Sequence, residues 1–448
     1  MWEMDVAIVG GGPAGVATAL ALQKQGNLRV AILEKSYQDG FRIGETVPPA
    51  IRASLAQLDV LDRVEGDGHL PALGSCSAWG GEVLGFNDFW LYAGGGGWHL
   101  DRRRFDAMLM NAAVERGAVL KRGIRVVGWE KHPEGKWELM LLEQGGRRSQ
   151  LATRFVVDAT GYRGAFALQQ GAQIVRSDAL IAIATLFELE KAFPQDGYTL
   201  IEAAQLGWWY AAHLPGHRAI VTLMSDRELL QQQQFSRPAV WRAQLEKTRY
   251  VREVCDRATA QSQLWVKPAF SQYLAPITGN GWLAVGDAAC TLDPLSSAGI
   301  NKALHSAIKA AAAIVRHFNG DSNALHHYAT QIQHQVELYL ADRRKYYQQE
   351  TRWPRSPFWQ HRSSPITLSP SSLLYFEDSA KTARALQTSK MHLPAKELRL
   401  LCALCTSPIP ASQVVSQFLN QTHHKISSYR TIEALQYLIK QHAIQSLA

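Results

Sequence analysis

The 448-residue sequence predicts an α/β fold in which one sheet binds a dinucleotide, a second sheet is inserted into it, and a small helical module ends the chain. Three observations predict this organisation. A glycine-rich turn joins a short apolar strand, residues 5–9, to an alanine-rich helix, residues 16–25. Residues 179–266 show the alternation that is typical of β-strands. Three helical patterns follow one another between residues 395 and 442.

The composition is that of an ordinary globular protein. The chain is 46% hydrophobic and 19% charged, which excludes disordered, collagen-like and coiled-coil classes. No apolar run reaches the roughly 20 residues of a membrane span, and residues 1–5 show no basic leader. We therefore expect a cytoplasmic protein with no membrane partner.

The five cysteines are scattered and odd in number, which agrees with a reducing compartment and argues against a disulfide framework. Cys402 and Cys405 have the spacing of metal ligands, but they lie in an apolar helical pattern with no second ligand pair. Core packing is the favoured interpretation, and no metal site is expected.

The net charge of +8 is unevenly distributed. Eight Lys or Arg residues and four acids give residues 369–448 a net charge of +4. This density is too low for a nucleic-acid footprint, so we expect no nucleic-acid partner.

The other elements alternate along the chain as an α/β fold requires. A second strand, residues 28–33, ends at Glu34, and a helix at 105–116 should lie on the sheet. A buried strand at 155–158 runs into a second glycine turn. The last predicted elements of this fold are a strand at 282–287 and two long helices at 299–318 and about 323–349.

These elements predict two domains. Residues 1–368 form a catalytic domain, in which about 1–170 and 267–350 bind the dinucleotide and about 171–266 form an antiparallel substrate sheet. Residues 369–448 form a small helical, winged-helix-like C-terminal domain.

The first turn carries the dinucleotide-binding spacing Gly10-x-Gly12-x-x-Gly15. The first glycine allows the tight turn, the second allows the backbone to approach a pyrophosphate, and the third allows close helix–strand packing. Ala14 lies in this turn, and the N-terminus of the helix that follows offers free N–H groups to the phosphates. Glu34, followed by Lys35, is placed to accept hydrogen bonds from a ribose.

Further segments indicate which dinucleotide is bound, because they resemble the superfamily of FAD-dependent monooxygenases and halogenases with the glutathione-reductase-type Rossmann fold. Arg42-Ile43-Gly44-Glu45 is similar to the family's segment along the flavin, and Arg102 to its arginine-led helix start. Asp158 to Gly161 is similar to its second glycine turn. The resemblance implies FAD as cofactor. It adds these residues to the expected cofactor site: Val126, Asp287, Pro294, Gly299 and Ile300.

The chemistry of the last segment agrees with this assignment. A helix beginning at Gly299-Ile300 would direct N–H groups at a flavin carbonyl that becomes electron-rich on reduction. Asp287 is an acceptor for ribityl hydroxyls.

Within the superfamily, the sequence resembles the tryptophan-halogenase-like branch. Gly207 to Pro215 is similar to its tryptophan-rich strand, and Arg352 to Arg362 to a segment near its C-terminus. The branch includes flavoproteins that oxidise a tryptophan of a partner polypeptide during maturation of quinone-cofactor (CTQ) enzymes.

Two departures from the halogenase pattern favour oxygenation over halogenation. A halogenase needs a lysine downstream of its Gly-Glu segment, but this chain has no lysine between Lys35 and Lys121. It also needs a glutamate before its last glycine motif, where this chain has Ser296-Ser297.

The resemblance therefore implies a single-component FAD monooxygenase that hydroxylates an aromatic ring through a flavin C4a-hydroperoxide, with O2 and a reductant such as NAD(P)H. His213 and His99 are candidate acid–base residues, because imidazole titrates near neutral pH. Core packing is the competing interpretation of every candidate. The candidate pocket residues are Trp79, Trp98, His99, Trp208, Tyr210 and His213.

The expected acceptor is a tryptophan in a partner polypeptide, during quinone-cofactor biogenesis. The C-terminal domain suggests this partner, since a small-substrate hydroxylase does not need it; a stabilising lid is the alternative role. Open alternatives for the whole protein are a small-molecule aromatic hydroxylase, a halogenase-like enzyme, an isoprenoid-type flavin reductase, and a DNA-binding redox sensor.

Overall fold

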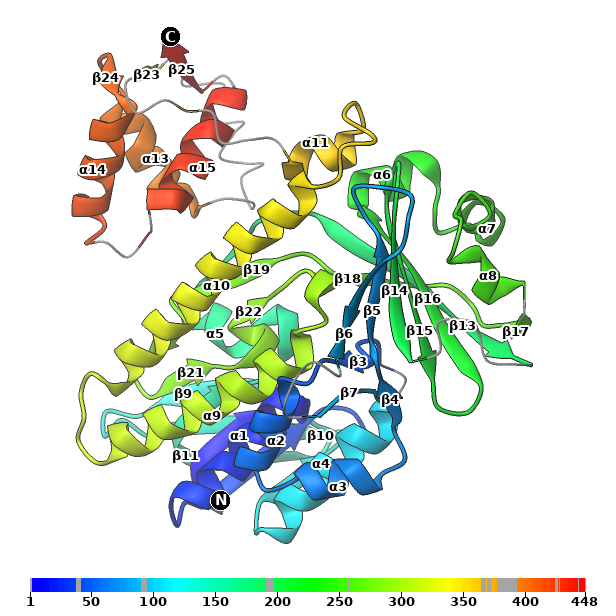
Figure 1. Cartoon of the computed structure of the whole chain (residues 1–448). Coiled ribbons are helices and arrows are strands. Elements are labelled where there is room, and N and C mark those ends of the chain that lie inside the picture. The colour runs from blue at the N-terminus through cyan, green and yellow to red at the C-terminus, as the bar shows by residue number, and fades with distance from the viewer. Residues whose placement is uncertain are drawn as a thin grey trace.

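A computed structural model places two large sheets side by side, with a separate C-terminal module at one end of a long helix (Figure 1). It describes residues 2–37, 42–89, 95–190, 197–256, 258–363, 368, 372–376, 393–423, 426, 428–441 and 443–447.

The first sheet has eight strands and contains the predicted dinucleotide-binding unit. Its main path runs β20-β21-β11-β1-β2-β8, and β10 joins β11 to β9. The strands from β21 to β8 are parallel, as the βαβ pattern requires. Their bounds are β1 Trp2–Val9, β2 Val30–Glu34, β8 Val119–Arg122, β9 Ile124–Lys131, β10 Trp137–Glu143, β11 Arg148–Asp158, β20 Thr278–Gly279 and β21 Trp282–Ala284.

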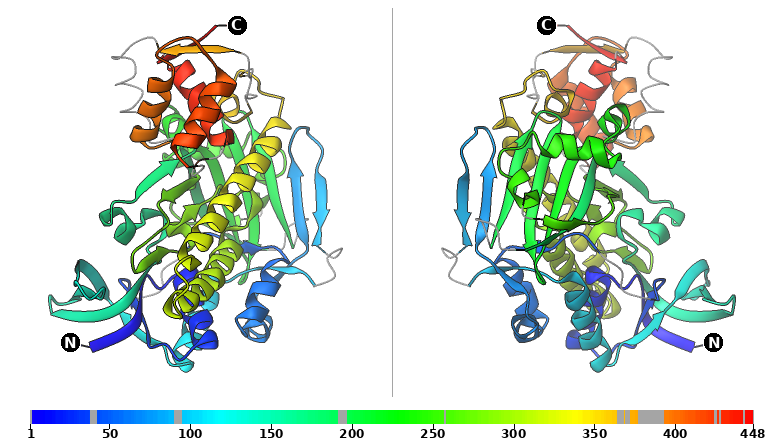
Figure 2. Two further views of the ribbon diagram at one scale, coloured as in Figure 1. Left: turned by 90° about the vertical axis from the view of Figure 1, so that its left-hand side faces the viewer. Right: turned by 90° about the vertical axis from the view of Figure 1, so that its right-hand side faces the viewer.

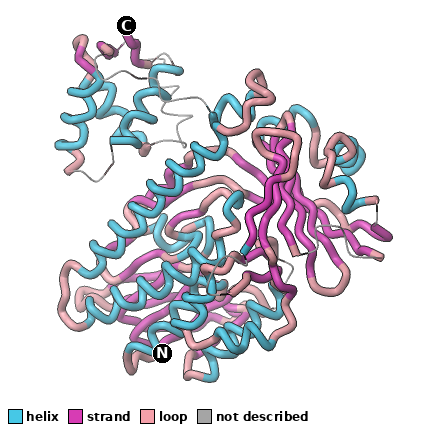
Figure 3. The backbone as a smooth tube through the Cα atoms, viewed as in Figure 1, coloured by secondary structure: helices cyan, strands magenta, loops and turns pink. Residues whose placement is uncertain are grey.

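Helices pack against this sheet and against one another (Figure 1 and Figure 3). Helix α1, Pro13–Gln25, has buried residues all round because it lies between β1 and helix α9, Gly299–Phe318. Small side chains such as Ala17 and Ala21 allow this close packing. The other elements around this sheet are α2 Ile51–Gln57, α3 Leu61–Gly66, α4 Arg102–Glu115, α5 Ala165–Gln169, α10 Ala324–Gln348 and the 3-10 turns η2 Gly161–Arg163, η3 Gly286–Ala288 and η4 Pro294–Ser296.

The second sheet corrects the predicted substrate sheet in two ways. It runs β17-β13-β16-β15-β14-β5-β6, with β18 on β13, so two strands come from residues 74–88. It is also mixed and not antiparallel, because β5 pairs parallel with β14. The bounds are β5 Gly74–Ala78, β6 Gly85–Asp88, β13 Leu180–Leu189, β14 Tyr198–Ala204, β15 Gly207–Leu214, β16 Arg218–Asp226, β17 Ala258–Gln261 and β18 Trp265–Pro268.

Short elements complete the catalytic part of the chain. One small sheet has the order β3-β7-β4 and another the order β12-β19-β22. Figure 2 shows the β5–β6 hairpin at one margin of the second sheet. The bounds are β3 Thr46–Val47, β4 Leu70–Ala72, β7 Gly97–His99, β12 Gln173–Arg176, β19 Gln272–Ala275, β22 Cys290–Thr291, α6 Arg227–Gln233, α7 Pro238–Leu245, α8 Arg252–Cys255 and α11 Pro357–Ser363.

The C-terminal module has its own apolar core, which includes Cys402 and Cys405. Burial raises the pKa of the Cys405 thiol to about 12, as expected for a packed side chain. Its elements are β23 Leu373–Phe376, α13 Ala395–Leu404, β24 Ile409–Pro410, α14 Ala411–Gln421, α15 Ser428–Lys440 and β25 Ile444–Leu447. Residues 369–371, at the expected boundary, and four of the counted cations lie outside the described residues; the cations are Lys381, Arg384, Lys390 and Lys425.

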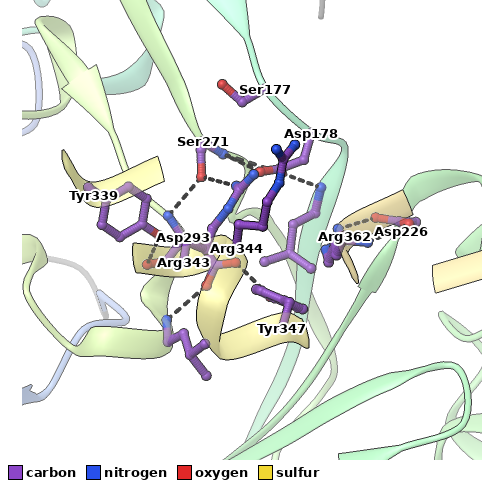
Figure 4. A network of polar contacts seen from close by, with 12 residues as sticks. Ser177, Asp178, Asp226, Ser271, Asp293, Tyr339, Arg343, Arg344, Tyr347 and Arg362 are labelled. Carbon is purple, nitrogen blue, oxygen red and sulfur yellow. Dashed lines mark hydrogen bonds and ion pairs between the residues drawn. The ribbon is translucent and has the colours of Figure 1, made fainter. Parts of the chain in front are cut away.

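Helix α10 carries a buried polar network that joins the two sheets (Figure 4). The Arg343 guanidinium pairs with Asp178, just before β13, and donates to the Ser271 hydroxyl at 2.7 Å. The Tyr347 hydroxyl donates to the Asp293 carboxylate at 2.6 Å and accepts from the Trp208 indole N–H at 3.0 Å. The helix is thus tied to the second sheet and to the loop before α9.

Nearby, Arg362 of α11 forms a buried ion pair with Asp226 at the end of β16, with nitrogen–oxygen distances of 2.5 and 2.8 Å (Figure 4).

None of the helices in the described part of the chain is both long and apolar enough to cross a bilayer.

Candidate active site

A cavity of about 710 Å³ lies where the first sheet, α1 and α9 meet the second sheet. This volume is within the range of cofactor and ligand sites. Sixteen of the residues expected from the sequence line it: Gly10, Gly12, Ala14, Glu34, Lys35, Arg42, Ile43, Glu45, Arg102, Val126, Gly161, Tyr210, Asp287, Pro294, Gly299 and Ile300.

The glycine turn has almost no room for side chains. Gly10 has φ +117°, and a Cβ there would lie 2.2 Å from the Ala159 carbonyl oxygen. A Cβ at Gly15 would lie 2.0 Å from the Gly10 carbonyl oxygen, so Gly15 serves packing and does not line the cavity. Gly12 has ordinary dihedral angles, and a Cβ there would contact the Arg42 guanidinium at 3.6 Å but no backbone, which leaves the N-terminus of α1 accessible from the cavity.

Glu34 lies at the other side of this turn. Its carboxylate accepts the backbone N–H of Gly11 and that of Ser36, both at 2.7 Å. These bonds fix the carboxylate at the cavity wall, beside Lys35 and Val126.

Asp158 has a different place from the one expected, because it does not line the cavity. Its buried carboxylate accepts hydrogen bonds from the Thr160 hydroxyl at 2.7 Å and from the backbone N–H groups of Phe166 and Ala167 at 3.0 and 2.9 Å. Burial raises the pKa of this carboxyl although these donors lower it. Asp158 therefore positions the turn that brings Gly161 to the cavity.

Arg102 holds the segment that follows Arg42. It donates to the carbonyl oxygens of Ile43 and Gly44 at 2.9 and 3.1 Å, and it pairs with Asp106 at 3.1 Å. Arg42 pairs with the same carboxylate at 3.3 Å. The two arginines thereby fix the backbone that directs Glu45 into the cavity.

Asp287 has a partner that the sequence analysis did not include. Lys302, one turn into α9, lines the cavity and pairs with the Asp287 carboxylate at 2.7 Å. Burial lowers the pKa of Lys302, but the Asp287 carboxylate and Cys290 together raise it, and the net shift is upward, so the ammonium stays charged. Lys302 follows Gly299 by three residues, so both lie on one face of the expected helix, and this spacing could have identified the lysine from the sequence.

At the second sheet, Tyr210 of β15 begins a chain of buried hydroxyl groups. Its hydroxyl lies 2.8 Å from that of Thr46, which lies 2.9 Å from the Thr199 hydroxyl and 3.0 Å from His99 Nδ1. Burial raises the pKa of Tyr210, so the phenol keeps its proton. The chain leads from the cavity into the interior.

The other candidate catalytic residues, His99, His213 and Trp208, do not line the cavity, and neither do the candidate pocket residues Trp79 and Trp98. His99 lies at the inner end of the hydroxyl chain, and burial lowers its pKa to about 4, so it is neutral at pH 7. His213 lies three residues after Tyr210 on β15, so its side chain is on the opposite face of the strand. Trp208 is fully buried and packs with Trp79, and Trp98 stacks under Arg52.

Glu45 has an unusual environment for a carboxyl group. Its side chain is buried, and neither oxygen makes a hydrogen bond of normal geometry. Burial raises its pKa to about 7, although the backbone N–H groups of Gly44 and Glu45 and the charge of Arg102 act in the opposite direction.

Comparison with known proteins places this site in a family. Residues 95–391 match the family model described as tryptophan halogenase, and residues 5–45 match a model described as FAD binding domain. The chain belongs to the tryptophan halogenase family. It is an FAD-dependent enzyme of the oxidoreductase and halogenase type, and its cofactor is FAD.

Two relatives show the range of this family. LodB of Marinomonas mediterranea, named as an FAD-dependent oxidoreductase, is 32% identical over 365 residues, which cover 81% of this chain and 97% of LodB. The tryptophan 2-halogenase of Chondromyces crocatus is 26% identical over 320 residues, 69% of this chain. The match spans only 60% of that halogenase.

Solved structures of flavin-dependent halogenases share the fold. The myxobacterial chondrochloren halogenase CndH has a TM-score of 0.76 at 20% identity, with 98% of each chain covered. CmlS has a TM-score of 0.74 at 22% identity, covering 98% of this chain and 78% of CmlS. The α/β FAD-binding Rossmann-type architecture predicted from the sequence is therefore confirmed.

The residues at the cavity fit FAD. Glu34, Lys35 and Val126 would hold the adenosine end, and the N-terminus of α1 with Arg42 would hold the pyrophosphate. Asp287 would meet the ribityl chain, and the start of α9 would meet the ring system. When bound and reduced, FAD supplies the electrons that activate O2.

The two glycines predict separable effects of an added methyl group. Gly12→Ala should fold normally but bind FAD at least about tenfold more weakly, because its Cβ enters the cavity beside the α1 N-terminus. Gly15→Ala should lower the thermal midpoint of the protein itself, because its Cβ meets backbone. Flavin titration and thermal unfolding measure the two effects.

The control is Gly66→Ala, since a Cβ there meets no atom within 4 Å. Equal flavin affinity in Gly12→Ala and Gly66→Ala would contradict the cofactor placement.

Glu45 predicts a pH dependence of stability. Because its pKa is about 7 in the folded protein and 4.5 as a free group, the folded state retains a proton that the unfolded state loses between these values. The free energy of unfolding should therefore fall as pH rises through this window. Glu45→Gln should remove that loss. The difference in the free energy of unfolding between this variant and wild type should therefore shift in favour of the variant by about 3 kcal/mol from pH 4 to pH 8.

Denaturant unfolding across this pH range measures the difference. Glu246→Gln is the control, because this side chain is 70% exposed. A constant difference between Glu45→Gln and wild type at every pH would contradict the buried titration.

Proposed function

We propose that this enzyme is an FAD-dependent monooxygenase that oxidises an aromatic ring, namely a tryptophan side chain of a partner polypeptide during quinone-cofactor biogenesis. Family membership and the almost complete coverage of LodB support an FAD-dependent oxidation. The resemblance to flavoproteins that oxidise protein tryptophan supports the acceptor. O2 and a reductant such as NAD(P)H are the proposed co-substrates.

The positions of the lysines support oxygenation over halogenation. The segment from Gly44 through β3, β4, β5 and β7 contains no lysine. Among described residues, three lysines line the cavity: Lys35 beside the ribose-binding Glu34, Lys302 paired with Asp287, and the exposed Lys267 of β18. No lysine therefore projects from the Gly-Glu side, where a halogenase needs one.

The end of the cavity at the second sheet suits a ring substrate. Its lining there includes Ala182, Tyr210, Thr222 and Met224, with Pro268 and Ala269 beside them. An aromatic ring and apolar side chains with a few polar atoms are typical of sites for flat, hydrophobic ligands.

The C-terminal module supports a polypeptide acceptor. It is attached to the body by the Arg344–Glu433 ion pair at 2.8 Å and by Arg430, which lies over the Tyr273 ring. On α13, Lys396 and Arg399 are exposed. We propose that this basic helix docks an acidic segment of the partner.

Halogenation is the second candidate, because the family model and the Chondromyces relative are named for it. The test supplies reduced FAD, O2 and a tryptophan-containing peptide, with and without chloride or bromide. We expect a mass gain of one or two oxygen atoms that does not depend on halide. Halide incorporation would establish halogenation, and an unchanged peptide with slow flavin reoxidation would favour a reductase.

Charge reversal tests the docking role of α13. Lys396→Glu combined with Arg399→Glu should lower oxidation of the full-length acidic partner by about tenfold, because two attractive charges become repulsive. Oxidation of a short tryptophan peptide should not change. Arg147→Glu with Arg148→Glu, exposed at the start of β11, is the control. Equal losses in both double variants would exclude a specific dock.

A further inference from the structure

Three polar atoms near Tyr210 are buried and make no hydrogen bond of normal geometry. They are both carboxylate oxygens of Glu45 and the hydroxyl oxygen of Thr222, and both residues line the cavity. A buried polar group without a partner costs free energy, so an arrangement of this kind is typical of a site that a ligand completes.

The three atoms belong to one end of the cavity. Thr222 on β16 is the direct cross-strand neighbour of Tyr210 on β15. Glu45 acts electrostatically on the Tyr210 hydroxyl, and the next residue, Thr46, is bonded to that hydroxyl. The Tyr210 hydroxyl is therefore already engaged, whereas the groups on either side of it are not.

Chemistry restricts what can satisfy Glu45. The carboxyl group keeps an acceptor oxygen in either protonation state, so a ligand that presents an N–H or O–H group can satisfy it. The backbone that precedes it is held in place by the Arg102 bonds to the carbonyl oxygens of Ile43 and Gly44. The surrounding wall is apolar or aromatic, which suits a donor carried on a flat ring.

We propose that Glu45 binds the substrate directly by accepting the ring N–H of an indole, beside the hydroxyl of Thr222. The inference rests on the proposed function for the identity of the ring. It assigns the selectivity for a ring with an N–H group to one side chain, which lies in a segment expected to serve only the cofactor.

The experiment uses two probes, N-acetyl-L-tryptophanamide and its analogue methylated at the indole nitrogen. Calorimetric titration of the FAD-loaded oxidised protein with each probe needs no turnover. The wild type should bind the N–H probe at least about tenfold more tightly, because the hydrogen bond to the Glu45 carboxyl group is lost on methylation.

Glu45→Leu, of similar size but without an acceptor, should bind both probes equally. Glu45→Gln should retain a reduced preference, since its amide oxygen still accepts. Glu246→Leu, the same change at a 70% exposed position, should keep the full preference.

The outcomes separate this inference from the proposed function. Equal binding of both probes by the wild type, or a preference that persists in Glu45→Leu, overturns the role of Glu45 while tryptophan remains the substrate. Failure of both probes to bind the wild type overturns the proposed ring and the inference with it.

If Glu45→Leu loses FAD, the result for Glu45→Gln decides between the two roles of Glu45. A preference of Glu45→Gln for the N–H probe that equals the wild-type preference would show that Glu45 serves the cofactor, and it would overturn the inference.

Discussion

The active-site cavity depends on a buried charge network that holds two sheets at a fixed separation. Arg343 and Tyr347, on one face of α10, bind Asp178 beside the second sheet and Asp293 in the loop before α9. Removing one member of such a pair leaves the other charge buried and unpaired, which is strongly unfavourable. The network therefore fixes where the cofactor end of the cavity meets the second sheet.

The two ends of the cavity are built by different means. At the nucleotide end, the backbone forms most of the site, since the turn at Gly10 and Gly15 excludes side chains and offers N–H groups. At the sheet end, side chains such as Tyr210 and Thr46 form a connected set of hydroxyls. A fold can thus keep one cofactor while its substrate changes, because only the second end needs new side chains.

The sequence was sufficient for elements with local signals. The helix at Gly299–Phe318 has the predicted bounds, and the glycine spacing led directly to the cavity. It was not sufficient where long-range pairing decides: nothing near residues 74–88 indicates that β5 joins β14. The sequence also could not separate the aromatic residues. Trp208 and Tyr210 share a strand face, but Tyr347 covers Trp208, whereas Tyr210 lines the cavity. Thr222 had no local signal at all.

The parallel pairing of β5 with β14 also determines when the second sheet can be completed. During synthesis from the N-terminus, the residues of β5 and β6 are made before their partner strand Tyr198–Ala204. One side of β5 then lacks its hydrogen-bond partners until translation has passed Ala204, and an unpaired strand is prone to pair wrongly. A vulnerable stage in the biosynthesis of this enzyme therefore lies in its second sheet, after the first strands of the nucleotide-binding sheet have been synthesised.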